Sequence, residues 1–290
     1  MLVDLPSFGY TVNKTEERRD TKMAENYMAE ICCGSYYDAK QAALGGAGRI
    51  ELNSALMMGG LTPTAAVLGL VKEQFPGLAV IAMLRPRGAG FCYREEEFAA
   101  MERECRNLLE QGADGIAFGC LREDASLDEE KNQRLVEQIK GFGKEAVFHR
   151  AFDCCQNPYI AMERLIRMGV DRVLTSGGKP TAIQGMERIG ELQRCFGGKI
   201  QILAGSGVNS NNACELMEKT GVRQVHSSCK AWNMDPTTVR GDVSFSIAPG
   251  EGGCQYDVVS ADLVRGLVER VEAFGRKQGR GTFKVEGKGV

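Results

Sequence analysis

The chain has 290 residues, 43% of them hydrophobic and 26% charged, and its 36 Lys and Arg against 38 Asp and Glu give a net charge of −2. This balance argues against electrostatic binding to nucleic acid or to an anionic membrane. No apolar run reaches the roughly 18 residues that a membrane-spanning helix needs. The cysteines number eleven, an odd count that includes two adjacent pairs, which is poor geometry for a disulfide framework. We therefore expect reduced thiols in a cytoplasmic protein.

Residues 1–28 are polar and lack sustained periodicity. They also lack the apolar core and small-residue cleavage site of a signal peptide. We expect them to form a flexible or disordered extension outside the folded domain.

From residue 29 onward, short apolar runs with the length of buried strands alternate with helical patterns. The runs span residues 29–33, 48–52, 78–84, 114–118, 145–149, 171–175, 200–204 and 223–227. Thr62-Pro63 and Asn157-Pro158 predict helix N-caps with proline at the first helical position. Ser126 has the capping-box spacing to Glu129, and Ser260 is expected to open the last helix.

Eight strand–helix units without a break in composition predict a single α/β domain, a (β/α)8 TIM barrel over residues 29–273. Residues 274–290 are expected to be a flexible C-terminal tail. The alternative is a doubly wound parallel sheet, but Gly34-Ser35-Tyr36 after the first run is not the glycine-rich phosphate fingerprint of that fold. Residues 228–259 form an unusually long connection, which is typical of a functional or disordered loop.

In such a barrel the functional residues lie at the carboxyl ends of the strands. The candidate catalytic residues there are Glu51, Arg85, His149, Arg150 and Asp153. If Glu51 points inward, its buried carboxylate needs a partner, and Arg85 and Arg150 are the natural ones. The alternatives are structural ion pairs and satisfied core histidines. Asp153 would orient His149, contact substrate or cap the following turn.

The connections after the seventh and eighth strands predict an anion site. They contain Gly205, Ser206, Gly207, Ser227 and Ser228, which offer close backbone approach, N–H groups and hydroxyl donors. An arginine from across the mouth would supply the compensating charge. The alternative is that the glycines only turn a short loop. Neither this segment nor Ser176-Gly177-Gly178-Lys179 matches a dinucleotide fingerprint or a P-loop.

Cys32 and Cys33 are the candidate metal ligands, because soft thiolates suit Cu(I). Neighbours on a strand point to opposite faces, so one ion cannot readily take both sulfurs. Copper would need one of the two plus a sulfur from elsewhere in the chain or from a second subunit. The residue chemistry alone favours two packed cysteines.

A series of motifs, in order from about residue 29 to 273, resembles the CutC family. The motifs are Glu30-Ile31-Cys32-Cys33, Arg49-Ile50-Glu51-Leu52, Gly59-Gly60-Leu61-Thr62-Pro63, Arg85-Pro86-Arg87-Gly88 with Phe91-Cys92-Tyr93, Phe148-His149-Arg150-Ala151-Phe152-Asp153, Leu174-Thr175-Ser176-Gly177, Ala204-Gly205-Ser206-Gly207-Val208 and Val225-His226-Ser227-Ser228. The resemblance implies a cytoplasmic TIM-barrel protein of copper homeostasis that binds Cu(I) through Cys32 and Cys33. Many members of the family have cysteine where this chain has Asn53, so one soft ligand is missing here.

Two functional hypotheses follow. The first is a copper homeostasis protein that binds Cu(I) through cysteine thiolates. The second is a TIM-barrel enzyme acting on a small anionic, phosphorylated or polyhydroxylated substrate, with Glu51 or His149 as general base and Arg85 positioning the anion. A scaffold with a vestigial rim, and assembly into a homo-oligomer, are also compatible with the sequence.

Overall fold

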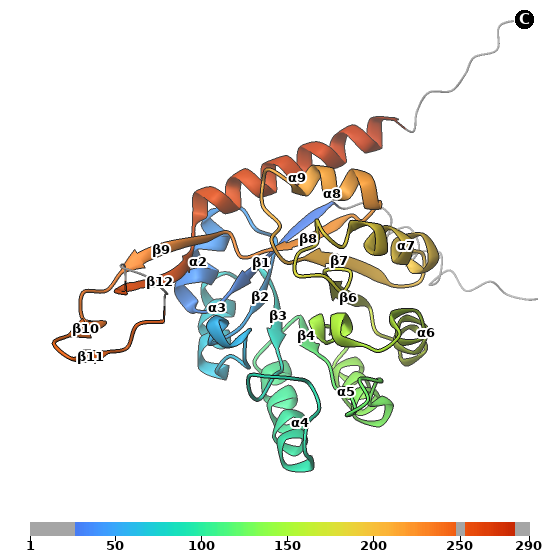
Figure 1. Ribbon diagram of the computed structural model, residues 1–290, viewed down its shortest axis with the longest axis horizontal. Coiled ribbons are helices and arrows are strands. Elements are labelled where there is room, and N and C mark those ends of the chain that lie inside the picture. The colour runs from blue at the N-terminus through green and yellow to red at the C-terminus, as the bar shows by residue number, and fades with distance from the viewer. Residues whose placement is uncertain (1–26, 248–252, 282–290) are drawn as a thin grey trace, which may run out of the picture.

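The computed structural model describes residues 27–247 and 253–281 and contains a closed barrel of eight parallel strands (Figure 1). The predicted (β/α)8 TIM barrel is therefore confirmed. Each strand pairs with the next along the chain, and β8 closes the barrel on β1. The strands are β1 Met28–Cys33, β2 Arg49–Leu52, β3 Ala79–Met83, β4 Gly115–Phe118, β5 Glu145–Phe148, β6 Arg172–Thr175, β7 Gln201–Gly205 and β8 Gln224–Ser227.

A long helix follows each barrel strand and packs on the outside of the barrel (Figure 1). The eight helices are α2 Tyr36–Leu44, α3 Ala65–Gln74, α4 Glu95–Glu110, α5 Glu129–Gly141, α6 Pro158–Met168, α7 Met186–Phe196, α8 Ala213–Thr220 and α9 Ala261–Gly281. Two short 3-10 helices, η1 Leu56–Met58 and η2 Arg150–Cys154, lie in the connections after β2 and β5. No helix of the described part of the chain is long and apolar enough to cross a membrane.

The helix starts were predicted with mixed success. Asn157 caps α6 and accepts hydrogen bonds from two backbone N–H groups, as predicted. The prediction for Thr62 is wrong because its hydroxyl bonds to the backbone at the end of β3, and Thr64 caps α3 instead. The capping box at Ser126 is also wrong, because Asp128 lies one residue before α5 and accepts from its third N–H group. A capping side chain competes with every nearby polar partner, so spacing alone does not fix the cap.

In its described residues, the long connection after β8 contains two small antiparallel sheets. β9 (Lys230–Met234) pairs with β12 (Gln255–Val259), and β10 (Val239–Arg240) pairs with β11 (Val243–Ser244). The pair β9–β12 starts at the barrel rim and extends outward as an arm (Figure 1). β9 alternates between more and less exposed residues, and only the last two residues of β12, Val258 and Val259, are buried, so neither strand carries the long apolar run of a core strand.

The boundaries of the domain differ from those predicted. β1 begins at Met28, and the ring of Tyr27 packs edge-on against Phe274 of α9, with ring centroids 5.4 Å apart. Helix α9 continues beyond residue 273, so residues 274–281 are helical and do not form a tail. Residues 1–26, which hold nearly all of the expected extension, and residues 282–290 lie outside the described residues.

The barrel interior has two different sides. Toward β3, β4 and β5 it is filled by a small apolar cluster of Ile81, Met83, Ala117 and Val147. Toward the other strands it holds buried charged side chains, namely Glu30 of β1, Arg49 and Glu51 of β2, Arg172 of β6 and His226 of β8. The main hydrophobic core lies outside the barrel, between the strands and the helices.

Candidate functional site

A cavity of about 350 Å³ opens at the carboxyl ends of the barrel strands. This is the end of the fold at which barrel proteins carry their functional residues. Most of the residues singled out from the sequence line this cavity: Cys32, Glu51, Arg85, His149, Arg150, Ser206, Gly207, Ser227 and Ser228. Cys33, Asp153 and Gly205 are not among its lining residues.

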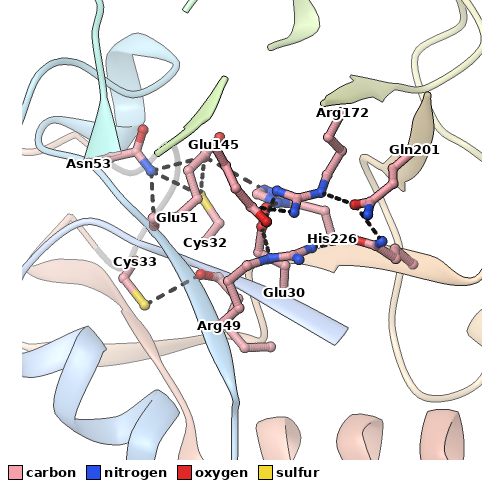
Figure 2. Close-up of polar contacts among 12 residues, drawn as sticks. Glu30, Cys32, Cys33, Arg49, Glu51, Asn53, Glu145, Arg172, Gln201 and His226 are labelled. Atoms are coloured by element: carbon pink, nitrogen blue, oxygen red, sulfur yellow. Dashed lines mark hydrogen bonds and ion pairs between the residues drawn. The ribbon is translucent and has the colours of Figure 1, made fainter. Parts of the chain in front are cut away.

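Three different metal-binding groups converge in this cavity: Cys32, Glu51 and His226. One ligand atom from each lies within 4.8 Å of the other two. Glu51 Oε2 is 3.7 Å from Cys32 Sγ, which donates to it, and 3.8 Å from His226 Nε2. Figure 2 shows this group with Asn53, whose amide nitrogen donates to Glu51 Oε2 at 3.0 Å.

A buried ionic network lies below this group and positions His226 (Figure 2). Glu30 Oε1 lies 2.9 Å from His226 Nδ1, and Arg49 Nε donates to Glu30 Oε2 at 2.5 Å. Arg172 Nη1 is 3.9 Å from the same oxygen, and its other terminal nitrogen donates to Glu145. The imidazole therefore has a fixed orientation, with Nε2 turned toward Glu51 and Cys32.

The ionisation of these groups follows from their surroundings. Burial alone would lower the pKa of His226, but the carboxylates of Glu51 and Glu30 and the thiol of Cys32 hold that pKa well above its usual value. Burial would raise the pKa of Glu30, yet Arg49, His226 and Arg172 hold it well below its usual range. Burial raises the pKa of Glu51, and it raises the pKa of the Cys32 thiol to about 12. Burial therefore favours the neutral form of the Cys32 thiol, whereas the acidic groups beside His226 favour its imidazolium form.

Cys33 lies on the other face of β1, as the alternation of strand side chains predicts. Its thiol is buried and donates to the backbone carbonyl of Ile31 at 3.6 Å (Figure 2). The two neighbouring sulfurs therefore do not face the same site.

The expected pairing of Glu51 with two arginines is wrong. The guanidinium of Arg85 donates to the backbone carbonyls of Met58, Gly60 and Ala89, and it ties two rim loops together. Arg150 pairs with Asp153 at 2.8 Å and donates to the hydroxyl of Ser176. Backbone carbonyls hold the two terminal nitrogens of Arg85, whose Nε has no hydrogen-bond partner among the described residues, and Asp153 pairs with Arg150. Glu51 pairs instead with side chains on its own side of the barrel.

Asp153 bonds to the connection after β6 and not to His149. Its carboxylate accepts from the hydroxyls of Thr175 and Ser176 and from the backbone N–H groups of Ser176 and Gly178. Asp153 therefore fixes the connection after β6 and not the turn that follows it in the chain, which was the structural alternative open from the sequence.

His149 lies on the apolar side of the cavity, against the ring of Phe91. Its Nδ1 accepts from the N–H of Ala151, so the neutral ring carries its proton on Nε2. That Nε2 is buried and has no hydrogen-bond partner among the described residues. Burial, together with the positive charge of Arg85, lowers the pKa of His149 to about 3. The side chain is thus a neutral donor at physiological pH.

The connections after β7 and β8 present N–H groups at the cavity. Gly207, Val208 and Ser228 line the cavity, and no hydrogen bond within the described residues uses their backbone N–H groups. The hydroxyls of Ser206 and Ser227 are already engaged, because they donate to the carbonyls of Pro180 and Val208. The donors free for an anion are therefore these backbone groups and the hydroxyl of Ser228, which has no hydrogen bond among the described residues, and not the hydroxyls of Ser206 and Ser227.

The candidate list from the sequence omitted His226 and Glu30. His226 stands at the end of its predicted strand, where a satisfied core histidine is the alternative to a functional one. Glu30 precedes Cys32 by two residues, so both side chains point to one face of β1. A charged residue repeated at inward positions of β1 and β2 is the signal that could have found this network.

The polar, partly charged interior and the cavity at the strand ends define a (β/α)8 barrel with a candidate site at the carboxyl ends of its strands. Comparison with known proteins gives its family. Residues 27–231 match the model of the CutC family. The family protein CutC of Treponema denticola is 41% identical over 250 residues, covering 86% of this chain and 98% of the relative. Family protein CutC of Porphyromonas gingivalis is 40% identical over 248 residues, covering 84% and 98%. The chain therefore belongs to the CutC family.

Solved structures agree with this assignment. A crystal structure described as that of a copper homeostasis protein CutC from Streptococcus agalactiae aligns with a TM-score of 0.66 at 27% identity, covering 70% of this chain and 98% of the other. The 3-hexulose-6-phosphate synthase of Salmonella typhimurium aligns with a TM-score of 0.55 at 13% identity, covering 85% and 99%. The second likeness shows the barrel fold alone.

Proposed function

We propose that this chain is a copper homeostasis protein whose barrel mouth binds Cu(I) through Cys32. The observation that carries the proposal is the inward-facing thiol of Cys32, which shares the cavity with the imidazole of His226 and the carboxylate of Glu51. A thiolate and an imidazole nitrogen are both suitable ligands for Cu(I). The family name supports the same ion. Copper is the bound cargo in this proposal, and Cys33, on the opposite face of β1, contributes no ligand to the same ion.

The test is the Cu(I) affinity of two single-cysteine variants, measured by competition with a chelating dye under reducing conditions. Cys32→Ser should weaken Cu(I) binding at least about tenfold, which corresponds to a loss of about 1.4 kcal/mol. Cys33→Ser is the matched control, because it removes a neighbouring buried thiol that faces away from the cavity, and it should leave the affinity unchanged. Equal affinities of the wild type and Cys32→Ser would contradict the thiolate site.

We also propose a cytoplasmic location. All eleven cysteines belong to the described residues and are free thiols. This supports a reducing compartment, in which such thiols persist.

We propose as a second candidate function an enzyme that acts on a small anionic, phosphorylated or polyhydroxylated substrate in the same cavity. The specific observation in its favour is the set of unpaired backbone N–H groups of Gly207, Val208 and Ser228, together with the unpaired Nε2 of His149. Backbone donors of this kind suit phosphate or carboxylate oxygens. His149 would donate a hydrogen bond to the substrate, and Glu51, with its raised pKa, would act as general base.

Anion binding is tested by thermal melting. Sulfate or phosphate should raise the melting temperature saturably, beyond the effect of chloride at matched ionic strength. Gly207→Asp should abolish that increment, because it places a carboxylate where the anion would lie. Gly221→Asp is the control, since Gly221 also has a positive φ, +77° against +71° at Gly207, but lies at the end of α8. An absence of saturable stabilisation in the wild type would exclude the anion site.

A further inference from the structure

We infer that Cys32, Glu51 and His226 form a three-ligand site for a dication of the Zn²⁺ type, with a fourth coordination position open to the cavity. The inference rests on the proposed metal site at Cys32 and concerns which ion that site is built for. It is carried by the spacing of the three ligand atoms, by the groups that support them and by the charge of the bound state.

The spacing fits tetrahedral coordination. Around Zn²⁺, sulfur, nitrogen and oxygen ligands with bonds of about 2.0–2.3 Å lie about 3.3–3.6 Å from one another. Glu51 Oε2 is 3.7 Å from Cys32 Sγ and 3.8 Å from His226 Nε2. The Glu51 oxygen needs to approach the other two ligand atoms by only a few tenths of an ångström, and all three atoms already lie within 4.8 Å of one another. A two-coordinate Cu(I) ion would use the sulfur and the nitrogen and would leave the carboxylate without a function.

The supporting contacts are those of a metal centre. The hydrogen bond of 2.9 Å between His226 Nδ1 and Glu30 Oε1 leaves Nε2 as the coordinating nitrogen and fixes the ring plane (Figure 2). Asn53 Nδ2 donates to Glu51 Oε2 at 3.0 Å and to Cys32 Sγ at 3.6 Å, so one amide orients two ligands. A carboxylate behind a coordinating histidine and a hydrogen bond to a coordinating carboxylate are common in metalloproteins.

The charge of the bound state favours a dication. A coordinated thiolate and a coordinated carboxylate carry two negative charges, and a coordinated imidazole is neutral. Zn²⁺ makes this group neutral, whereas Cu(I) leaves one negative charge. In each of the surrounding ion pairs, Glu30–Arg49 and Glu145–Arg172, the two opposite charges already neutralise one another. Since Cys32, Glu51 and His226 lie in the barrel interior, an uncompensated charge there is costly.

The set of ligands also resembles a catalytic site more than a structural one. Structural Zn²⁺ sites have four protein ligands, whereas catalytic sites have three and leave one position for water or substrate. All three ligand residues here line the cavity of about 350 Å³, which also contains His149. A water or an anionic ligand in that cavity can therefore take the fourth position.

The test uses the full chain after chelation and dialysis, with ZnCl₂ alone and with Co²⁺ as a spectroscopic probe. One Zn²⁺ per chain should bind, and Co²⁺ should give the visible d–d absorption of a tetrahedral ion and a thiolate-to-cobalt charge-transfer band. Cys32→Ser should abolish the charge-transfer band. Glu51→Gln, which keeps the side-chain volume, should weaken Zn²⁺ binding at least about tenfold. Glu51→Gln should change Cu(I) binding much less than Zn²⁺ binding. Cys33→Ser should change neither the Zn²⁺ affinity nor the Cu(I) affinity.

The outcomes separate this inference from the proposed function. Cu(I) binding through Cys32 without stoichiometric Zn²⁺ binding would overturn the inference and leave the copper proposal standing. Zn²⁺ binding that survives Cys32→Ser would identify a different site and would also overturn the inference. Failure of both ions to bind would contradict both proposals. Zn²⁺ binding that requires Cys32 and Glu51 would support the inference, whether or not Cu(I) also binds.

Discussion

The two histidines of the chain have opposite charge states for identifiable reasons. His149 is buried against Phe91 and near Arg85, so the pKa of its imidazole falls to about 3 and the ring is neutral. His226 is equally buried, but it lies between the carboxylates of Glu30 and Glu51, which raise its pKa well above the usual value. Both residues end a barrel strand in the sequence. The difference in their charge states comes only from the side chains that other parts of the barrel place beside them.

The buried neutral His149 should make the fold less stable in mild acid. In the unfolded chain a histidine takes up a proton below about pH 6.5, but folded His149 does so only near pH 3. The free energy of unfolding should therefore fall between these values, by on the order of 1 kcal/mol per pH unit from this residue. His149→Gln should remove this part of the slope, as measured by urea denaturation at several pH values.

His226 gives the internal control, because the sign of its contribution is reversed. Its raised pKa stabilises the fold fully below about pH 6.5, and this stabilisation is lost as the pH rises through the folded pKa. His226→Gln should flatten the alkaline side of the stability profile and leave the acidic slope due to His149. An unchanged acidic slope in His149→Gln would show that another group causes it.

At the scale of single elements, the connection from β6 to α7 is held by side-chain hydrogen bonds and by glycine conformation. Asp153 of η2 bonds to Thr175, Ser176 and Gly178, and Gly177 and Gly178 adopt φ angles of +71°. Gly185, at the start of α7, lies against the same turn. A Cβ atom on Gly185 would lie 1.9 Å from the carbonyl oxygen of Ser176. This turn therefore requires glycine because of close backbone approach.

Gly185→Ala should destabilise the protein by about 1–3 kcal/mol, because the added methyl group forces the turn away from α7. The control is Gly141→Ala at the end of α5, where nothing lies within 4 Å of the added Cβ. That variant should be neutral or more stable by up to about 1 kcal/mol, since alanine restricts the unfolded chain. Guanidinium denaturation of both variants checks the prediction, and equal stabilities would contradict it.

The sequence predicts the strands and helices of the barrel well. It predicts poorly which strands of the arm pair and which side chains meet in the site. Strands buried on both faces are continuous apolar runs, so all eight can be found without knowing the fold. The arm of β9 and β12 has no such run, and its pairing joins residues 21 to 29 positions apart in the chain, from Met234–Gln255 to Lys230–Val259. The pairing of Glu51 depends on the register that sets Cys32 beside it and on β8 closing the barrel next to β1. No local pattern contains that information.

At the scale of the whole molecule, α9 completes the ring of helices and stabilises the closure of the barrel. It packs on β1 and between α2 and α8. Helix α2 follows the first barrel strand, and α8 precedes the last one. Val264, Leu267 and Val271 are buried on one face, at the spacing of an amphipathic helix. The last helix thus covers the junction between the first and the last strand.

Leu267→Ala should lower the free energy of unfolding by about 2–5 kcal/mol, because a fully buried leucine leaves a cavity at this junction. Leu263→Ala, one turn earlier on the same helix, is the control, since its side chain is 47% exposed. The control should change the stability by less than about 0.5 kcal/mol. Equal losses in the free energy of unfolding for the two variants, measured by urea denaturation, would show that the buried face of α9 does not stabilise the closure of the barrel.

The division of the barrel interior has a consequence for stereochemistry. The lining of the cavity includes the polar side chains of Cys32, Glu51 and His226 and, at other positions, the apolar side chains of Met83 and Phe91. The N–H groups of the β7 and β8 connections form a third part of the lining. A ligand with a polar edge, an apolar edge and an anionic end can satisfy all three parts in one orientation only. Its mirror image must place at least one edge against the wrong part, so the cavity should distinguish enantiomers of a small chiral ligand.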